Sequence, residues 1–166
     1  MRFKSGILIA LCLVVATSCM KQGDYSDIPE IEFSNWVSYF DTGQFATRGA
    51  LTILFRDGNG DIGLNPGDTF PPYDTSSQYY YNYVITYFEK QKGDFVKIDL
   101  NPPYSARIPV LTPEYPGKSI KGIIADTLDL NPKPTFDTIR FELFIYDRSL
   151  NKSNIVTTPE IILRRH

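Results

Sequence analysis

Apolar and polar side chains alternate along most of the chain, and this period of two predicts β-strands. In the clearest run, residues 137–145, four apolar side chains occupy alternate positions: Ile139, Phe141, Leu143 and Ile145. Similar patterns predict six further strands, at residues 29–33, 46–55, 79–90, 95–98, 118–130 and 155–163. No segment has the 3.6-residue period of a helix, so the domain is predicted to be all-β.

Turn-forming residues separate these runs, for example at 41–44, 91–94 and 131–134. Pro159 lies within the last run and marks it as an edge strand, because proline cannot donate to a ladder. About seven short strands with turns between them predict a single antiparallel two-sheet sandwich of Ig-like or fibronectin-like type. The 11 Tyr and 11 Phe residues agree with a β-rich chain.

The N-terminus carries an export signal. Arg2 and Lys4 precede an apolar run at 6–16 that is too short to span a bilayer, and Ala-Thr-Ser-Cys follows it. This end resembles the lipobox of bacterial lipoproteins, which implies that Cys19 is lipidated. We therefore predict a signal peptide at 1–18, a flexible lipid-anchored tether at 19–28 and a β-sandwich at 29–166. Cleavage after a small residue by an ordinary secretory route is the alternative.

A lipid on Cys19 predicts anchoring to the bacterial outer membrane, on either its periplasmic or its outer side. The chain has two cysteines, and Cys12 leaves with the signal peptide, so the domain is expected to fold without disulfides. Residues 1–18 hold two basic and no acidic residues, so their removal changes the net charge from −2 to −4. An acidic domain argues against a nucleic-acid partner.

The strand at 46–55 leads into the most polar stretch of the chain, Asp-Gly-Asn-Gly-Asp-Ile-Gly. Asp57, Asn59 and Asp61 have the spacing of the first, third and fifth ligands of an EF-hand loop, and Asp68 falls at the twelfth position. However, Ile62 stands where an EF-hand has glycine, and flanking helices are not predicted. An EF-hand is therefore excluded, and a local cluster of oxygen ligands is what the pattern supports.

Asp147 continues the inward row of the strand at 137–145, as Asp57 continues that of the strand at 46–55. In an Ig-like sandwich these two strands end at the same pole, on opposite sheets. The predicted calcium ligands are therefore Asp57, Asn59, Asp61 and Asp147, with Asp68 and Asn151 as additional candidates. The alternative is a plain turn, or a salt-bridge network in which Asp147 pairs with Arg148 or Arg56.

The sequence offers little for catalysis. The single histidine is His166 at the C-terminus, and neither a Gly-x-Ser-x-Gly motif nor a phosphate-binding loop occurs. A carboxylate pair such as Asp57 with Asp61, or Glu142 with Asp147, could act on a glycoside, but nothing marks such a pair as a cleft. We therefore predict that the protein is not an enzyme.

Residues 137–154 resemble the last hairpin of bacterial Ig-like domains, in which a strand ends in Asp and its loop carries Asn and Ser. With the stretch at 57–63, the chain resembles small Ig-like lipoproteins of Bacteroidota, a likeness that specifies no activity. The predicted function is an envelope module that binds or scaffolds a protein partner. A carbohydrate-binding module of a glycan-uptake system, using the tyrosines at 79–87, is the alternative.

Overall fold

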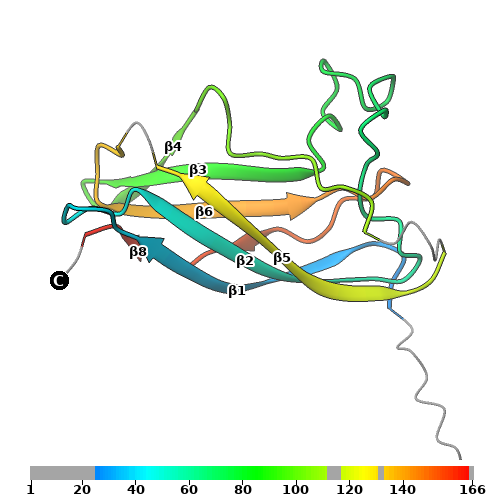
Figure 1. The fold of residues 1–166 in the computed structure, drawn as a ribbon, viewed down its shortest axis with the longest axis horizontal. Helices are drawn as coiled ribbons and strands as arrows, with labels where there is room; N and C mark the ends of the chain where they lie inside the picture. The colour runs from blue at the N-terminus through cyan, green and yellow to red at the C-terminus, as the bar shows by residue number, and fades with distance from the viewer. Residues whose placement is uncertain (1–24, 112–116, 131–132, 165–166) are drawn as a thin grey trace, which may run out of the picture.

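The computed structural model describes residues 25–111, 117–130 and 133–164, so the predicted signal peptide and Cys19 lie outside the described residues. Two antiparallel sheets face each other (Figure 1). One has the order β1-β2-β5 and consists of β1 (Glu30–Tyr39), β2 (Arg48–Asp57) and β5 (Ile120–Asp129).

The second sheet has the order β4-β3-β6-β7, and β8 also pairs with β6. Its strands are β3 (Tyr83–Gln91), β4 (Asp94–Ile98), β6 (Thr138–Ile145), β7 (Val156–Thr157) and β8 (Ile161–Ile162). In the lettering of Ig-like sandwiches the sheets are A-B-E and C′-C-F-G. The predicted all-β sandwich is confirmed, and the described residues contain no helix that could cross a bilayer.

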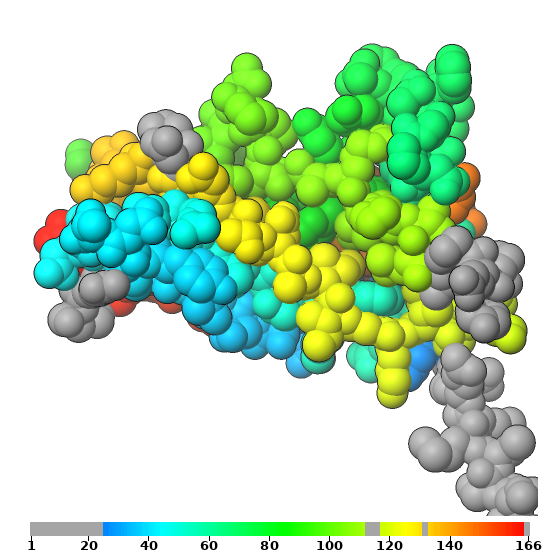
Figure 2. Space-filling model, in the orientation of Figure 1, coloured from blue at the N-terminus to red at the C-terminus, as the bar shows by residue number. Residues whose placement is uncertain are grey.

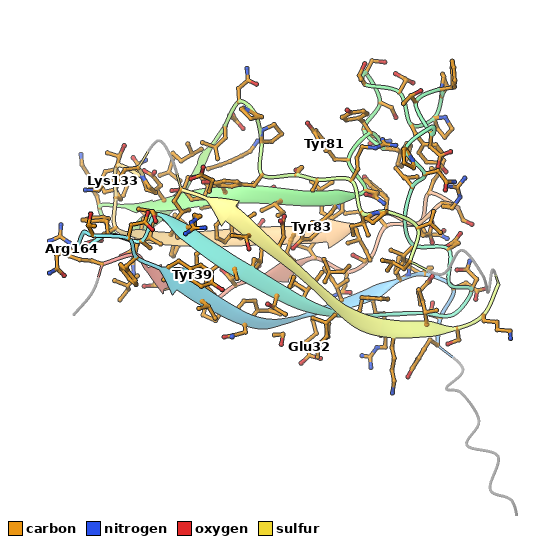
Figure 3. The ribbon with its side chains drawn as sticks, in the orientation of Figure 1. Glu32, Tyr39, Tyr81, Tyr83, Lys133 and Arg164 are labelled. Atoms are coloured by element: carbon orange, nitrogen blue, oxygen red, sulfur yellow. The ribbon has the colours of Figure 1, made fainter. Side chains whose placement is uncertain are left out.

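The core lies between the sheets and follows directly from the alternation in the sequence. On β2 the buried row includes Leu51, Ile53 and Phe55, and on β6 all four predicted inward residues are completely buried. Trp36 enters the core beside Phe141, with ring centroids 5.4 Å apart. Figure 3 shows the ring of Tyr83 between the two layers.

The first and third strands differ from the prediction. β1 continues to Tyr39 because a bulge between Phe33 and Asn35 restores the inward register, which the simple alternation did not reveal. The predicted strand at 79–90 begins only at Tyr83. The backbone N–H of Tyr80 donates to Ser77 and its carbonyl accepts from Arg107, so this part of the chain is held outside the ladder.

The predicted closing strand at 155–163 is two short strands on the edge of β6. Between them, the Thr158 hydroxyl accepts from the Phe141 N–H at 3.1 Å and replaces the backbone carbonyl in the ladder. Pro159 follows and interrupts the pairing.

Gly49 gives a test of the packing between β1 and β2. A Cβ atom at this position would lie 1.8 Å from the Trp36 ring, so Gly49→Ala must displace a side chain that fills the core. We expect a loss of about 1–3 kcal/mol in the free energy of unfolding, measured by denaturant titration. Gly67→Ala is the matched control, because a Cβ there meets nothing within 4 Å. Equal stabilities of the two variants would contradict this packing.

Candidate metal centre

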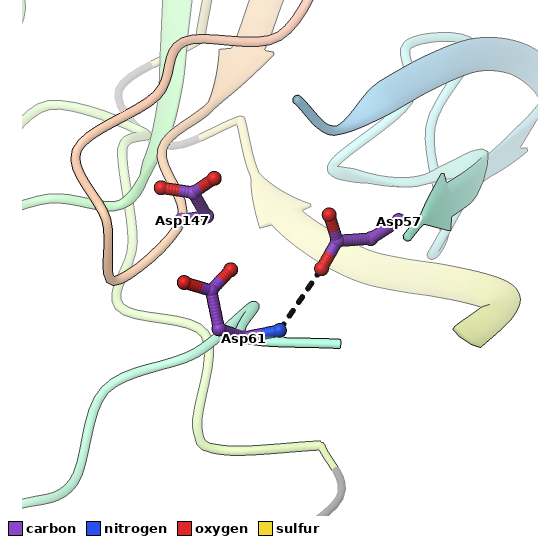
Figure 4. A group of neighbouring side chains, drawn as sticks. All are labelled: Asp57, Asp61 and Asp147. Atoms are coloured by element: carbon purple, nitrogen blue, oxygen red, sulfur yellow. Dashed lines mark hydrogen bonds between the residues drawn. The ribbon is translucent and has the colours of Figure 1, made fainter. Parts of the chain in front are cut away.

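Three carboxylates meet at the pole of the sandwich where β2 and β6 end (Figure 4). Asp57 is the last residue of β2 and continues its inward row, while Asp147 lies two residues beyond Ile145 on β6. Both side chains are buried. Asp61 reaches the same point from the loop after β2, and one oxygen from each of the three carboxylates lies within 4.8 Å of the others.

The loop after β2 turns back on itself through two glycines with positive φ. Gly60 (φ 68°) and Gly63 (φ 114°) adopt backbone conformations that side chains disfavour, and a Cβ on either would meet a backbone oxygen at about 2 Å. This turn brings Ile62 into a β-bridge with Asp147, and the Arg148 N–H donates to the Asp61 carbonyl at 3.1 Å. The backbone therefore fixes Asp61 beside the end of β6.

Hydrogen bonds hold one oxygen each of Asp57 and Asp61 and both oxygens of Asp147. The Asp61 N–H donates to Asp57 Oδ2 at 2.9 Å, and Ser149 donates its N–H and hydroxyl to Asp61 Oδ2 at 3.1 and 2.7 Å. Asn151 donates its N–H and side-chain amide to Asp147 at 2.7 and 2.8 Å. The remaining oxygens of two residues, Asp57 Oδ1 and Asp61 Oδ1, are buried and accept no hydrogen bond.

The pole is unfavourable for negative charge. Burial raises the pKa of Asp57 to about 6, and the charges of Asp61 and Asp147 add to the effect, against hydrogen bonds that oppose it. Burial also raises the pKa of Asp147, although the bonds from Asn151 counteract it. Such a cluster favours either protons or a bound cation.

The predicted salt-bridge partners of Asp147 are engaged elsewhere. Arg148 Nη1 contacts Asp68 Oδ2 at 2.5 Å, and Arg56 Nε contacts Glu30 Oε2 at 2.7 Å. Within the described residues, no ion pair to a lysine or arginine was found for any of the three clustered carboxylates. The salt-bridge alternative for Asp147 was therefore wrong.

The other predicted ligands have different neighbours. Asn59 Oδ1 accepts a long bond from the Asp61 N–H at 3.3 Å. Asn151 is a hydrogen-bond donor to Asp147, as described above, and Asp68 caps the backbone N–H of Asn65 at 2.7 Å while it pairs with Arg148. Ser149 could not be predicted from the sequence, because a single serine in a polar loop carries no signal of its own.

The tyrosines at 79–87 do not form a flat aromatic surface. Tyr83 and Tyr87 are buried, and the three residues at 79–81 are half-buried. The rings of Tyr80 and Tyr81 meet at 74°, and those of Tyr79 and Tyr146 at 73°. Stacking on a sugar needs coplanar exposed rings, so these residues give the carbohydrate-binding alternative no support.

Comparisons with protein-family models, curated proteins and solved structures find no match to this chain.

The raised pKa of Asp57 predicts how the stability of the metal-free protein depends on pH. Because the folded state binds this proton more tightly than the unfolded chain, the stabilisation is complete below the unfolded pKa of 3.8 and is lost as pH rises through about 6. In chelator, we expect the ionisation of Asp57 to lower the free energy of unfolding by about 2 kcal/mol between pH 4 and pH 7.5. Asp57→Asn should flatten this dependence, and an unchanged slope would refute the prediction.

Proposed function

We propose that this chain is a non-catalytic, lipid-anchored module of the bacterial cell envelope that binds a protein partner. A calcium ion held by Asp57, Asp61 and Asp147 stabilises one pole of its Ig-like sandwich. The observation that carries the calcium site is the unpartnered Oδ1 of Asp57, which is completely buried beside two other carboxylates. A buried carboxylate oxygen without a donor is costly, and a cation supplies the missing interaction.

The chemistry of the cluster fits a hard cation. All three side chains offer carboxylate oxygens, the ligands that calcium and magnesium prefer, and there is no sulfur or imidazole among them. Calcium takes its ligands at about 2.3–2.6 Å, so two of its ligands lie up to roughly 5 Å apart, whereas magnesium limits this separation to roughly 4 Å. The oxygens of this cluster lie within 4.8 Å of one another, so a calcium ion can reach all three carboxylates.

The same ion would join the two sheets. Asp57 ends a strand of one sheet, Asp147 follows a strand of the other, and Asp61 belongs to the loop that crosses between them. A cation would neutralise their mutual repulsion and hold the loops after β2 and β6 together. The role of this ion is structural, because the groups around it, the glycine-rich turn and the fixed backbone of Asp61, hold the loops after β2 and β6 in place.

Calcium should raise the melting temperature of the purified domain at pH 7.5. At a calcium concentration 100 times the dissociation constant, the free energy of unfolding rises by about 2.7 kcal/mol. At roughly 3–4 °C per kcal/mol for a domain of this size, the shift is readily measured by scanning calorimetry. Isothermal titration should give one ion per chain.

Asp57→Asn separates a metal site from a simple turn. It keeps an oxygen for the Asp61 N–H but removes a buried charge, so we expect the variant to be at least as stable as the wild type in chelator and to gain nothing from calcium. Asp94→Asn, at the exposed first residue of β4, is the control and should respond to calcium like the wild type. Identical wild-type melting curves in calcium and in chelator would eliminate the site.

The proposed lipid anchor follows from the N-terminal sequence, and the structure shows at which pole the chain enters the domain. The Gly58 N–H donates to the Ser26 carbonyl at 2.7 Å, so the chain enters the domain at the pole that carries the carboxylates. Residues 19–25 are too few for a long spacer, since an extended chain covers at most about 3.6 Å per residue. A lipid on Cys19 would thus keep this pole near the membrane.

Replacement of Cys19 tests the anchor. In a bacterial host that processes lipoproteins, Cys19→Ala should abolish incorporation of labelled fatty acid and move the protein from the membrane fraction to the soluble fraction. Cys12→Ala should leave both unchanged, because this residue is predicted to leave with the signal peptide. Continued membrane association of unlabelled Cys19→Ala protein would show that the anchor is wrong.

A further inference from the structure

The segment between β2 and β3 includes a long loop at residues 65–82, which we call the apical loop. It contains no strand, and Figure 2 shows it (teal to green) rising as a separate knob above the sandwich. Long loops inside compact domains are usually functional. In an Ig-like sandwich this segment is the B–C loop, which lies at the same end as the F–G loop and contributes to the binding site of antibody variable domains.

The knob presents an apolar side chain. Phe70 is 77% exposed, the most exposed large apolar residue in the described part of the chain, and Pro71 and Pro72 beside it are also exposed. Burial of an exposed aromatic side chain against a partner removes apolar surface from water, which contributes favourably to the free energy of binding. The rest of the loop is rich in Tyr, Ser, Thr and Asn, a composition close to that of antibody binding loops.

The loop is ordered before any partner arrives. The Arg107 guanidinium donates to three of its carbonyls, those of Asp68, Tyr73 and Tyr80, at 2.7, 3.4 and 2.6 Å. The same group lies 4.9 Å from the centre of the Tyr80 ring. An ordered loop loses less conformational entropy on binding, so a single anchor side chain can contribute more to affinity.

A second arginine ties the loop to the carboxylate cluster. Arg148 follows Asp147 directly, pairs with Asp68 of the loop, and accepts a 2.6 Å hydrogen bond from the Tyr73 hydroxyl at its carbonyl. Its N–H donates to the Asp61 carbonyl. The apical loop and the candidate metal centre therefore form one connected structure.

The charge of the loop favours a protein over a lipid surface. Residues 65–82 include two aspartates and no lysine or arginine, whereas loops that dock on anionic membranes carry basic residues. Asp68 is paired with Arg148, and Asp74 is half-buried with a pKa lowered by the hydrogen bonds that it accepts from Ser76. A partner surface with a neutral or positive rim complements this loop.

We propose that the apical loop is the partner-binding site of this protein. Phe70 is its anchor and inserts into an apolar pocket of a protein whose rim is neutral or positively charged. This inference rests on the proposed function, because it identifies the surface through which the envelope module binds its partner.

Site-specific photocrosslinking in the full-length lipidated protein tests the site. Phe70→p-benzoylphenylalanine, placed in cells that express the chain, should give one discrete protein adduct on irradiation, which mass spectrometry identifies. Ile162→p-benzoylphenylalanine is the matched control, since this residue is 48% exposed and lies at the opposite pole. It should not give that adduct. Adducts to lipid alone, no adduct, or equal adducts from both positions would overturn the proposal.

The identified protein is then purified and titrated with the chain. Phe70→Ala should raise the dissociation constant at least about tenfold, and Ile162→Ala less than about twofold. Because Phe70 is exposed, the melting temperature of Phe70→Ala should stay at the wild-type value, so lost binding cannot reflect unfolding. An unchanged affinity of Phe70→Ala overturns the assignment of the loop yet leaves the envelope function standing, while the failure of that function appears separately in the Cys19→Ala fractionation.

Discussion

The burial of Asp57 at the end of an apolar strand row is the constraint on which the pole of this sandwich depends. The side chain lies where the core would otherwise continue, beside Asp61 and Asp147, and one of its oxygens lacks a donor. A carboxylate in such a place must gain a proton or a cation, and its pKa of about 6 expresses the same cost. The turn at Gly60 and Gly63 brings the Asp61 N–H to this carboxylate as a hydrogen-bond donor.

Much of this arrangement could be predicted from the sequence because a period of two fixes the direction of each side chain. Leu51, Ile53 and Phe55 point inward, so Asp57 must do so as well, and the same reasoning applies from Ile145 to Asp147. The order of strands in an Ig-like sandwich then places both ends at one pole. These inferences needed only the alternation and the general topology.

What the sequence could not show depends on contacts between distant segments. The third strand was predicted to begin at Tyr79, because its aromatic and apolar residues continue the alternation of the strand. It begins at Tyr83 instead, because Arg107, more than 20 residues further on, donates to the Tyr80 carbonyl and holds that stretch in the apical loop. Likewise, Asp68 has the sequence spacing of a calcium ligand, but its carboxylate forms an ion pair with Arg148 instead. Local patterns give no information about which distant arginine reaches a given oxygen.

These long-range contacts connect the carboxylate cluster to the apical loop. Arg148 stands between the carboxylate cluster and the apical loop: its backbone bonds to Asp61, and its side chain bonds to Asp68. Any ion that fixes Asp61 therefore also fixes the base of the loop that presents Phe70. Calcium and partner binding would then be thermodynamically linked, since an ion that holds Asp61 also holds the Arg148 contacts that support the loop. The buried carboxylates at the end of β2 would then also support the proposed binding surface.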